Sequence, residues 1–443
     1  MKGGLYALRK GLFGFQPLYY ATIHSEITPC TGTITFMLTP IATGIFAVGH
    51  IDWAVRDFHG YETDRGTTYN SYLLQFEKTA VIDGVKAPFA ADWLANLQKQ
   101  TTLDKIDYIV VNHAEPDHSG ALPTLVAAAP QATVVCNKKT QDFLTGYYDT
   151  SAWRFQLVKT GDTLALGAGK TLKFIEIPLV HWPDSMATYL VEEQMLFCND
   201  AFGEHFATNL RFDDENPLST LIFEAKSYYA NIVNPYSKRV SAVRAQLASV
   251  PMKMICPSHG VIWRKNLDAI LGAYQNWANQ RVQPKVVVLY DSMWHRTATM
   301  ANAIMEGVAQ VPGVVCKVLP ARAITENTLA TEMLDTAAVA LGSSTLNQQM
   351  MPMMAARLCY IQGLNFPGRA AFAFGSHGWG KGGPELLDAK IDELKWTRLC
   401  PPVLAKFEPT PEVLATCRQA GHALAEKALE LAAASGYQKT CID

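Results

Sequence analysis

The second half of the chain alternates between short apolar runs and amphipathic stretches, and this rhythm limits the possible folds more than any other feature. The run at 285–292 (KVVVLYDS) is continuously apolar at its centre, which is typical of a strand buried on both faces. The stretch at 297–310 (TATMANAIMEGVAQ) has apolar residues at helical spacing. The same order recurs at 336–364 and at 369–394. Strands that alternate with helices form a parallel sheet covered on both faces. We therefore predict a doubly wound α/β domain over residues 284–434.

The first half of the chain consists of short β-type runs separated by turns and a few short helical stretches. Some runs alternate and some are solidly apolar, which favours sheets covered by helices on one or both faces. The run at 67–76 (TTYNSYLLQF) is predicted as a strand, and the stretches at 120–130 and 139–148 are predicted as helices. Because 443 residues are too many for one ordinary core, we expect a separate domain over 37–280, followed by a linker within 276–285.

The first 36 residues are expected to be a disordered or accidental extension. Lys2, Arg9 and Lys10 precede some apolar residues, as in a secretory signal, but polar residues interrupt the stretch and no cleavage site follows. We hypothesise that Met37 is the true start.

The composition excludes several classes of partner. The net charge of −2 provides no basic field for nucleic acid or anionic lipid. No run of 18 apolar residues occurs, so no membrane span is expected. The nine cysteines are scattered and form no C-x-x-C pair, which excludes a zinc ribbon or a rubredoxin site and indicates a reducing, cytoplasmic environment.

A dense cluster of metal-binding residue types follows the apolar run at 106–111. It is the stretch NHAEPDHSG, in which His113, Glu115, Asp117 and His118 occupy six positions. In extended backbone, positions 113, 115 and 117 point to the same side, and a bend after Pro116 brings in His118. Carboxylates so close together repel each other and lose hydration unless a cation compensates them. The cluster therefore predicts a metal site.

Three more residues of the same types stand at predicted strand ends: His181 in HWPDS, Asp200 in CNDAFG and His259 in CPSHG. Open sheets build their sites at strand ends. Four histidines, one glutamate and two aspartates suit two metal ions that share a bridging carboxylate. For His181 or His259 taken alone, a hydrogen-bonded core histidine is the simpler interpretation.

Three loops of the second domain predict a flavin site. The loop at 290–301 (YDSMWHRTATMA) is rich in hydroxyl groups and opens a helix, which suits a phosphate. It contains neither G-x-x-x-x-G-K-[ST] nor G-x-G-x-x-G, and it resembles the FMN phosphate loop of flavodoxins. The loops at 342–348 and 375–383 end later strands, where the flavin ring would lie. Trp294 and Trp379 offer aromatic faces for that ring, or are simply surface aromatic residues. The expected FMN contacts are Ser292, Met293, Trp294, His295, Arg296, Thr297, Ser343, Ser344, Thr345, Asn347, Ser376, His377, Gly378, Trp379 and Gly380.

The order H-x-E-x-D-H, then His, Asp and His, resembles the metallo-β-lactamase fold. Hydrolases of that fold usually have His where this chain has Glu115, and they bind zinc. A more carboxylate-rich ligand set favours iron. This variant is similar to the flavodiiron proteins, as are the phrases HWPDSM, CNDAFG, YYANIVNPY and SHGVIWR. The resemblance covers roughly residues 40–425, with both domains in the same order, and implies an αββα sandwich followed by a flavodoxin-like domain.

The resemblance implies a role for each predicted ligand. One iron ion would be held by His113, Glu115 and His181, the other by Asp117, His118 and His259, and Asp200 would bridge them. It also implies that His59 and Tyr228 stand near the bound gas, where hydrogen bonds could stabilise it. For these last two residues, a packing or strand-edge role is almost equally compatible with the sequence.

The resemblance further implies an enzyme in which FMN passes electrons to the iron pair, which reduces oxygen to water or nitric oxide to nitrous oxide. Members of the family form head-to-tail homodimers, and the resemblance implies the same for this chain, while leaving open whether dimers pair into tetramers. Because the chain has no C-x-x-C pair for a rubredoxin module of its own, a separate rubredoxin-like protein is the expected electron donor. The same ligand set serves both gases, so the sequence leaves the choice between them open.

Two other functions remain open. One is a zinc-dependent hydrolase of the metallo-β-lactamase type fused to a flavodoxin domain, against which Glu115 argues. The other is a flavodoxin-like electron carrier with an inactive metal site, against which the complete ligand set argues.

Overall fold

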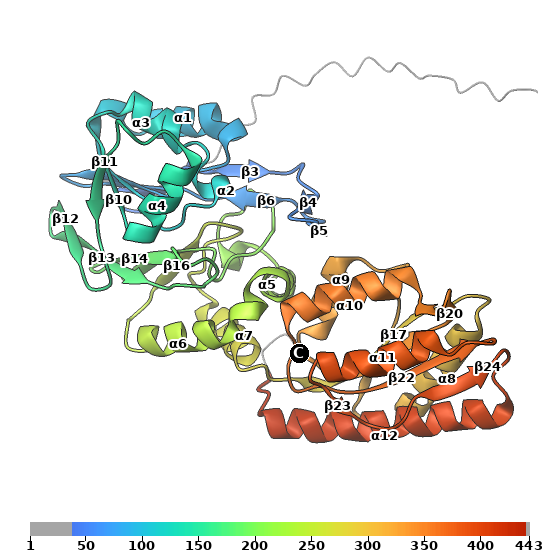
Figure 1. Cartoon of the computed structure of the whole chain (residues 1–443). Helices are drawn as coiled ribbons and strands as arrows, with labels where there is room; N and C mark the ends of the chain where they lie inside the picture. Colours follow the sequence, from blue (N-terminus) through green and yellow to red (C-terminus); the bar gives the residue numbers. More distant parts are fainter. Residues whose placement is uncertain (1–37, 440–443) are drawn as a thin grey trace, which may run out of the picture. The chain divides into compact units, whose positions relative to one another are not determined.

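The computed structural model describes residues 38–439, so the predicted extension over 1–36 and the hypothetical start at Met37 lie outside the described residues. The described part begins with two mixed sheets. The larger has the order β1-β2-β7-β8-β9-β10-β11 and the smaller the order β12-β13-β14-β15-β16 (Figure 1). The strands of the larger sheet are β1 (Thr39–Ala42), β2 (Ile45–Ala47), β7 (Tyr72–Gln75), β8 (Thr79–Ile82), β9 (Ile106–Val110), β10 (Thr133–Cys136) and β11 (Arg154–Leu157). Those of the smaller sheet are β12 (Thr163–Gly167), β13 (Lys170–Glu176), β14 (Met186–Leu190), β15 (Met195–Asn199) and β16 (Met254–Pro257).

Helices cover the outer faces of both sheets. Those of the larger sheet and its loops are α1 (Ala90–Gln98), α2 (Pro116–Ser119), α3 (Leu122–Ala128) and α4 (Lys138–Tyr147). Those of the smaller sheet are α5 (Leu218–Tyr228), α6 (Ser237–Leu247) and α7 (Leu267–Ala278). A π-helical turn at Tyr229–Val233 follows α5, and single 3₁₀ turns lie at Ala87–Phe89, Leu103–Lys105, Asp213–Glu215 and Asn234–Tyr236. Two small pairs, β3 (His50–Asp52) with β6 (Thr67–Tyr69) and β4 (Asp57–Phe58) with β5 (Tyr61–Glu62), complete this part.

The space between the two sheets is filled by inward-facing apolar side chains from both, among them Tyr72 and Ile82 of the larger sheet and Phe174 and Phe197 of the smaller. The opposite faces pack against the helices, because successive side chains of a strand point to opposite sides. The αββα arrangement implied by the resemblance is therefore confirmed.

The second part of the chain is a parallel sheet with the order β18-β17-β19-β22-β23, and β24 also pairs with β22. This is the flavodoxin-type strand order, so the predicted doubly wound sheet is confirmed. Its strands are β17 (Gln283–Asp291), β18 (Val315–Pro320), β19 (Thr336–Ser343), β22 (Ala370–His377), β23 (Thr397–Arg398) and β24 (Val403–Lys406), with a hairpin of β20 (Thr345–Leu346) and β21 (Gln349–Met350). Its helices are α8 (Arg296–Ala309), α9 (Glu326–Met333), α10 (Pro352–Leu364), α11 (Gly382–Glu393) and α12 (Pro411–Ser435).

Alternate residues of β17 explain how the parallel sheet is covered on both sides. Val286 and Val288 face α8 and α12, whereas Val287 and Leu289 face α9, α10 and α11. A strand buried on both faces must be apolar throughout, as the sequence indicated. The domain boundaries of 37–280 and 284–434 remain a prediction.

The predicted strand over 67–76 was wrong as one element. The structure divides it into β6 and β7, which belong to different sheets, with Asn70 and Ser71 between them. Asn70 donates hydrogen bonds to the carbonyls of Pro257 and Gly260, and the Ser71 hydroxyl donates to the Asp83 carbonyl. These polar side chains therefore bond to neighbouring loops at the point where the chain changes sheets.

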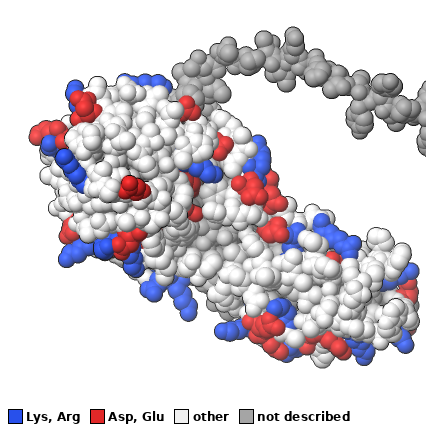
Figure 2. All heavy atoms as spheres, turned by 45° about the horizontal axis from the view of Figure 1, so that its top comes forward, with Lys and Arg blue, Asp and Glu red and all other residues white. Residues whose placement is uncertain are grey.

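Lysines, arginines and acidic residues are interspersed on the face that Figure 2 shows, in keeping with the small net charge. Within residues 38–439, no helix combines the length and the apolar character that crossing a membrane would require.

Candidate metal centre and flavin pocket

The structure brings all seven predicted metal ligands together, although they come from four separate segments of the chain. His113 and Glu115 follow β9, Asp117 and His118 lie on α2, His181 follows β13, Asp200 follows β15 and His259 follows β16. They form two groups, and within each group the donor atoms lie within 4.8 Å of one another. One group is His113, Glu115, His181 and Asp200, and the other is Asp117, His118 and His259.

Asp200 lies between the two groups. Its Oδ2 is 3.6 Å from Nε2 of His113 and 3.3 Å from Nε2 of His181, and its Oδ1 is 2.9 Å from Nε2 of His118 and 3.4 Å from Nε2 of His259. Each carboxylate oxygen thus faces one pair of histidines, which is the position of a carboxylate that bridges two metal ions.

The two remaining carboxylates complete the groups. Glu115 Oε2 lies 3.2 Å from Nε2 of His113 and 3.3 Å from Nε2 of His181. Asp117 Oδ2 lies 3.4 Å from Nε2 of His118 and 3.2 Å from Nε2 of His259. Donor atoms bound at about 2.0–2.3 Å to one ion are themselves about 3.0–3.5 Å apart, so this spacing suits a metal ion in each group.

The predicted backbone of the cluster was wrong at Asp117. Strand β9 ends at Val110 and α2 starts at Pro116, so Asp117 and His118 lie on a helical turn instead of extended backbone. Proline favours this change because its fixed φ suits the first position of a helix, where its missing N–H is not needed. Glu115 and Asp117 consequently face different groups instead of pointing to the same side of one strand.

Backbone and buried polar groups orient the histidine rings. Nδ1 of His259 lies 2.6 Å from the Thr68 carbonyl oxygen, to which it donates. Gly260, which follows His259, has φ +77°, and a Cβ at this position would lie 2.4 Å from Oε1 of Glu204. The loop therefore requires glycine beside the ligand, both for its left-handed backbone and for space.

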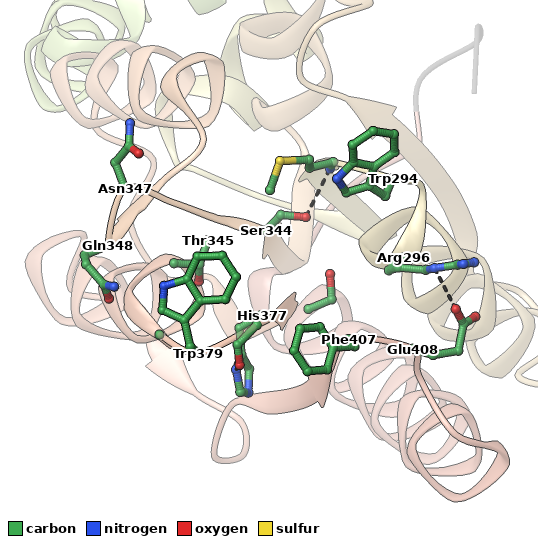
Figure 3. Close-up of a pocket in the computed structure, with 14 residues that line it drawn as sticks. Trp294, Arg296, Ser344, Thr345, Asn347, Gln348, His377, Trp379, Phe407 and Glu408 are labelled. Atoms are coloured by element: carbon green, nitrogen blue, oxygen red, sulfur yellow. Dashed lines mark hydrogen bonds and ion pairs between the residues drawn. The ribbon is translucent and has the colours of Figure 1, made fainter.

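The predicted flavin loops border a cavity of about 770 Å³ at the carboxyl ends of the parallel strands (Figure 3). Eleven of the residues expected to contact FMN line it: Met293, Trp294, Arg296, Ser344, Thr345, Asn347, Ser376, His377, Gly378, Trp379 and Gly380. Trp294 and Trp379 are 81% and 93% exposed, so their aromatic faces are free to contact a ring-shaped ligand.

Four expected flavin residues, Ser292, His295, Thr297 and Ser343, are not among those that line the cavity. Thr297 instead lies beneath it, with its hydroxyl 2.9 Å from the Ser344 hydroxyl and 3.1 Å from the Ser376 hydroxyl, so it joins the three loops. The Ser343 hydroxyl accepts a hydrogen bond from the Met351 N–H, and the Ser292 hydroxyl accepts one from the Ala298 N–H.

Comparison with known proteins identifies the combination of these two parts. The model of the ODP family of β-lactamases matches residues 67–260, and the flavodoxin model matches residues 288–421. An anaerobic nitric oxide reductase flavorubredoxin of Pectobacterium carotovorum is 40% identical over 397 residues, which are 88% of this chain and 78% of that protein. The flavodiiron protein of Giardia intestinalis is 37% identical, covers 90% of this chain and 98% of its own, and has a TM-score of 0.86.

This chain belongs to the flavodiiron proteins. A solved rubredoxin oxygen:oxidoreductase of Desulfovibrio gigas also matches, with 36% identity, a TM-score of 0.86 and coverage of 89% of this chain and 99% of that one. The resemblance inferred from the motifs is therefore confirmed, and with it FMN and two iron ions as the cofactors. The assignment of individual side chains to those cofactors remains our proposal.

The buried carboxylates of this flavodiiron protein fit two cations. Among the described residues, Asp200 Oδ2, which faces His113 and His181, is buried without a hydrogen-bond partner. Burial alone raises the pKa of Glu115, yet the hydrogen bonds from His113, His181 and His59 bring it below its ordinary value. A site that holds its carboxylates ionised without enough hydrogen-bond donors is suited to metal ions.

His59 and Tyr228, the two residues predicted to stand near the gas, both reach the metal pocket. Nε2 of His59 lies 2.8 Å from Glu115 Oε1, and this hydrogen bond raises the pKa of His59. Tyr228 is buried, with an exposed fraction of 2%, and the centroid of its ring lies 5.9 Å from that of His259. Burial raises the pKa of Tyr228 well above its ordinary value, and the nearby Asp200 carboxylate raises it further.

Sequence reasoning missed His205 and Asp184. The ring of His205 lies 4.9 Å from that of Tyr228 and 5.1 Å from that of His259, with Nε2 at 2.9 Å from the Tyr61 hydroxyl. Asp184 contacts Nδ1 of His113 at 3.0 Å. A signal existed for both, because each stands within five residues of a predicted ligand in the motifs CNDAFGEH and HWPDS.

Three residues outside the set of expected FMN contacts also line the flavin pocket: Gln348, which lies in the predicted loop at 342–348, and Phe407 and Glu408. Glu408 Oε2 lies 2.6 Å from Nε of Arg296, so the loop after β24 is held against the start of α8 (Figure 3). The other loops were predicted because sites form where parallel strands end. The same rule would have identified the loop after β24 if β24 had been recognised as a strand.

Proposed function

We propose that this flavodiiron protein is an oxidoreductase that reduces oxygen to water, nitric oxide to nitrous oxide, or both. The observation that carries the proposal is the position of Asp200, whose two carboxylate oxygens face two separate groups of ligands in a chain that also contains a flavin pocket. The reactions take up four electrons and four protons per oxygen molecule, or two electrons and two protons per two nitric oxide molecules.

The residues proposed to hold the iron ions are His113, Glu115 and His181 for one, Asp117, His118 and His259 for the other, and Asp200 for both. When bound, the irons supply redox equivalents and free coordination positions for a diatomic gas, and FMN supplies the electrons. The residues that line the flavin cavity, including Gln348, Phe407 and Glu408, are proposed to hold FMN.

The protein's own groups bind and orient the gas. We propose that the hydroxyl of Tyr228 and the imidazole of His59 donate hydrogen bonds in the pocket, since one stands beside His259 and the other beside Glu115. The rings of Phe58 and His205 lie 4.7 Å apart; Phe58 contacts the ring of His59, and His205 contacts the ring of Tyr228.

Glu115 argues against a zinc-dependent hydrolase, because it supplies an oxygen ligand where such hydrolases have a histidine. The two relatives that contain "rubredoxin" in their names support a rubredoxin-type electron donor for this chain. The seven cysteines among the described residues are free, which supports a reducing, cytoplasmic location.

A head-to-tail homodimer is part of the proposal. The flavin cavity is lined only by residues 293–408, and the proposed metal ligands all lie within 113–259. A second copy of the chain could bring its flavin beside these ligands, which would shorten the path for electrons.

The test is anaerobic turnover of the protein loaded with FMN and iron, with reduced rubredoxin as donor and each gas supplied separately. Consumption of either gas at a rate that depends on both cofactors supports the proposal. A flavin that cycles without consumption of either gas would contradict it and would favour the electron-carrier alternative.

A further inference from the structure

The helical segment that carries Tyr228 is bonded on both sides of this residue to the flavodoxin-like part of the chain. It comprises the end of α5 and the π-helical turn at Tyr229–Val233. π-Helical turns are rare, interrupt regular helices and are frequent at functional sites. Because Tyr228 is the last residue before this turn, the orientation of its ring depends on how the turn is held.

Asn327 of α9 bonds to the residues on either side of Tyr228. Its Oδ1 accepts a hydrogen bond of 2.5 Å from the Ser227 hydroxyl and one of 2.7 Å from Nδ2 of Asn231. The second hydrogen of that amide goes to the Ser227 carbonyl at 2.8 Å. A carbonyl oxygen accepts two hydrogen bonds, so the acceptor capacity of this atom is fully used.

Tyr360 of α10 holds the other end of the same amide. Its hydroxyl donates a hydrogen bond of 2.6 Å to Oδ1 of Asn231. Asn231 is 9% exposed, so its hydrogen bonds are shielded from water. Away from water a hydrogen bond is stronger, and a polar group left without a partner is costly. Nearby, Nζ of Lys226 and Oδ2 of Asp335 form an ion pair of 2.7 Å between the same two parts of the chain.

We infer that Asn327 and Tyr360 are positioning residues for the gas-reducing site: by bracing Ser227 and Asn231, they hold the phenol of Tyr228 in the metal pocket. The flavodoxin-like domain thus has a second role besides holding FMN, since it fixes part of the metal site of its own chain. This inference rests on the proposed function of the metal site, and it concerns two residues that do not contact metal, flavin or gas themselves.

The chain offers matched variants for a test. Asn327→Ala removes the acceptor of both hydrogen bonds, whereas Asn327→Asp keeps two acceptor oxygens in the same shape. Tyr360→Phe removes one donor and little volume, and so serves as a second variant if Asn327→Ala fails to fold. Thr328→Ala is the control, because Thr328 is the exposed next residue on α9 and bonds only to the helix cap at Thr325.

The first readout is hydrogen–deuterium exchange of the full chain loaded with FMN and iron, analysed for peptides that cover Ser227–Val233. We expect faster exchange there in Asn327→Ala and Tyr360→Phe, and wild-type exchange in Asn327→Asp and Thr328→Ala. Unchanged exchange in both of the first two variants would overturn the bracing itself, whatever the enzyme does with gases.

The second readout is steady-state gas reduction by the same samples, together with their iron and FMN contents. We expect kcat/KM for the gas to fall about three- to tenfold in Asn327→Ala, with recovery in Asn327→Asp and unchanged cofactor contents. Faster exchange with unaltered kcat/KM would overturn the positioning role. A wild-type protein that consumes neither gas would mark the failure of the proposed function, which is distinct because the exchange result does not depend on turnover.

Discussion

Oδ1 of Asp184 lies 3.0 Å from Nδ1 of His113, and both side chains are completely excluded from solvent. The other oxygen of Asp184 accepts a 2.8 Å hydrogen bond from the Ala114 N–H. The carboxylate therefore fixes the ring of His113 with Nδ1 protonated, which leaves Nε2 free to bind a metal ion.

Asp184→Asn should weaken iron binding, because an uncharged amide accepts a weaker hydrogen bond from Nδ1 of His113 and has no second oxygen for the Ala114 N–H. We expect the dissociation constant for ferrous iron to rise about ten- to a hundredfold, as for other partners of metal-binding histidines. The measurement is an anaerobic iron titration, with Asp149→Asn on the exposed loop after α4 as the control. Wild-type affinity in Asp184→Asn would show that Asp184 does not orient the ligand.

Glu115→His should change the metal preference of the site. The substitution exchanges a hard oxygen ligand for imidazole and produces the H-x-H-x-D-H pattern of zinc enzymes. We expect the purified variant to contain zinc in place of iron and to lose gas reduction, whereas Glu192→His on an exposed turn keeps both. Metal analysis after expression with equal iron and zinc decides this, and a variant that still holds two irons would refute the role of Glu115.

Thr297→Val should weaken FMN binding although Thr297 does not line the cavity. The substitution keeps the shape of the side chain but removes its contacts with Ser344 and Ser376, two residues that do line it. Each lost hydrogen bond costs about 1 kcal/mol, so the loss of both should raise the dissociation constant for FMN by up to about thirtyfold. Fluorescence titration measures it, and Thr299→Val, at a half-buried position of α8 that does not line the cavity, should bind FMN like the wild type. Equal affinities would mean that the loops hold their positions without Thr297.

Glu224 should make stability depend on pH. Burial raises its pKa from 4.5 to about 7, against the opposing effect of Arg65, whose Nε lies 2.8 Å from Glu224 Oε1. Between these two values the folded protein binds more protons than the unfolded chain, so the free energy of unfolding falls as the pH rises from about 4.5 to about 7, by up to about 3 kcal/mol.

The measurement for Glu224 is urea denaturation of metal-free protein across this pH range, compared with Glu224→Gln. The amide cannot ionise and keeps a hydrogen-bond acceptor for Arg65, so the variant should lose most of this pH dependence and gain stability relative to the wild type at pH 8. Parallel pH curves for the two proteins would contradict the assignment.

The sequence predicted those features that depend on local pattern. The strands and helices within 285–310, 336–364 and 369–394 were predicted because a strand buried on both faces must be apolar throughout, as Val286 to Leu289 show. The elements β18, α9 and β24 were not predicted. The ligands were predicted because clustered His, Glu and Asp residues at strand ends have few stable uses other than binding a metal ion.

Features that depend on distant contacts were not predictable in the same way. The break at Asn70 results from its hydrogen bonds to Pro257 and Gly260, nearly two hundred residues further along the chain. The roles of Asp184 and Asn327 likewise come from partners that only the folded chain brings near. Polar side chains of this kind look alike in a sequence, whether they face water or hold a ligand.

The most direct test of the account is a Mössbauer spectrum of protein loaded with ⁵⁷Fe, combined with metal analysis, for the wild type and for Asp200→Ala. The account predicts two iron ions per chain that are magnetically coupled in the wild type, and loss of that coupling together with most of the iron in the variant. A single iron, two uncoupled irons, or a coupled pair that survives the loss of Asp200 would contradict it.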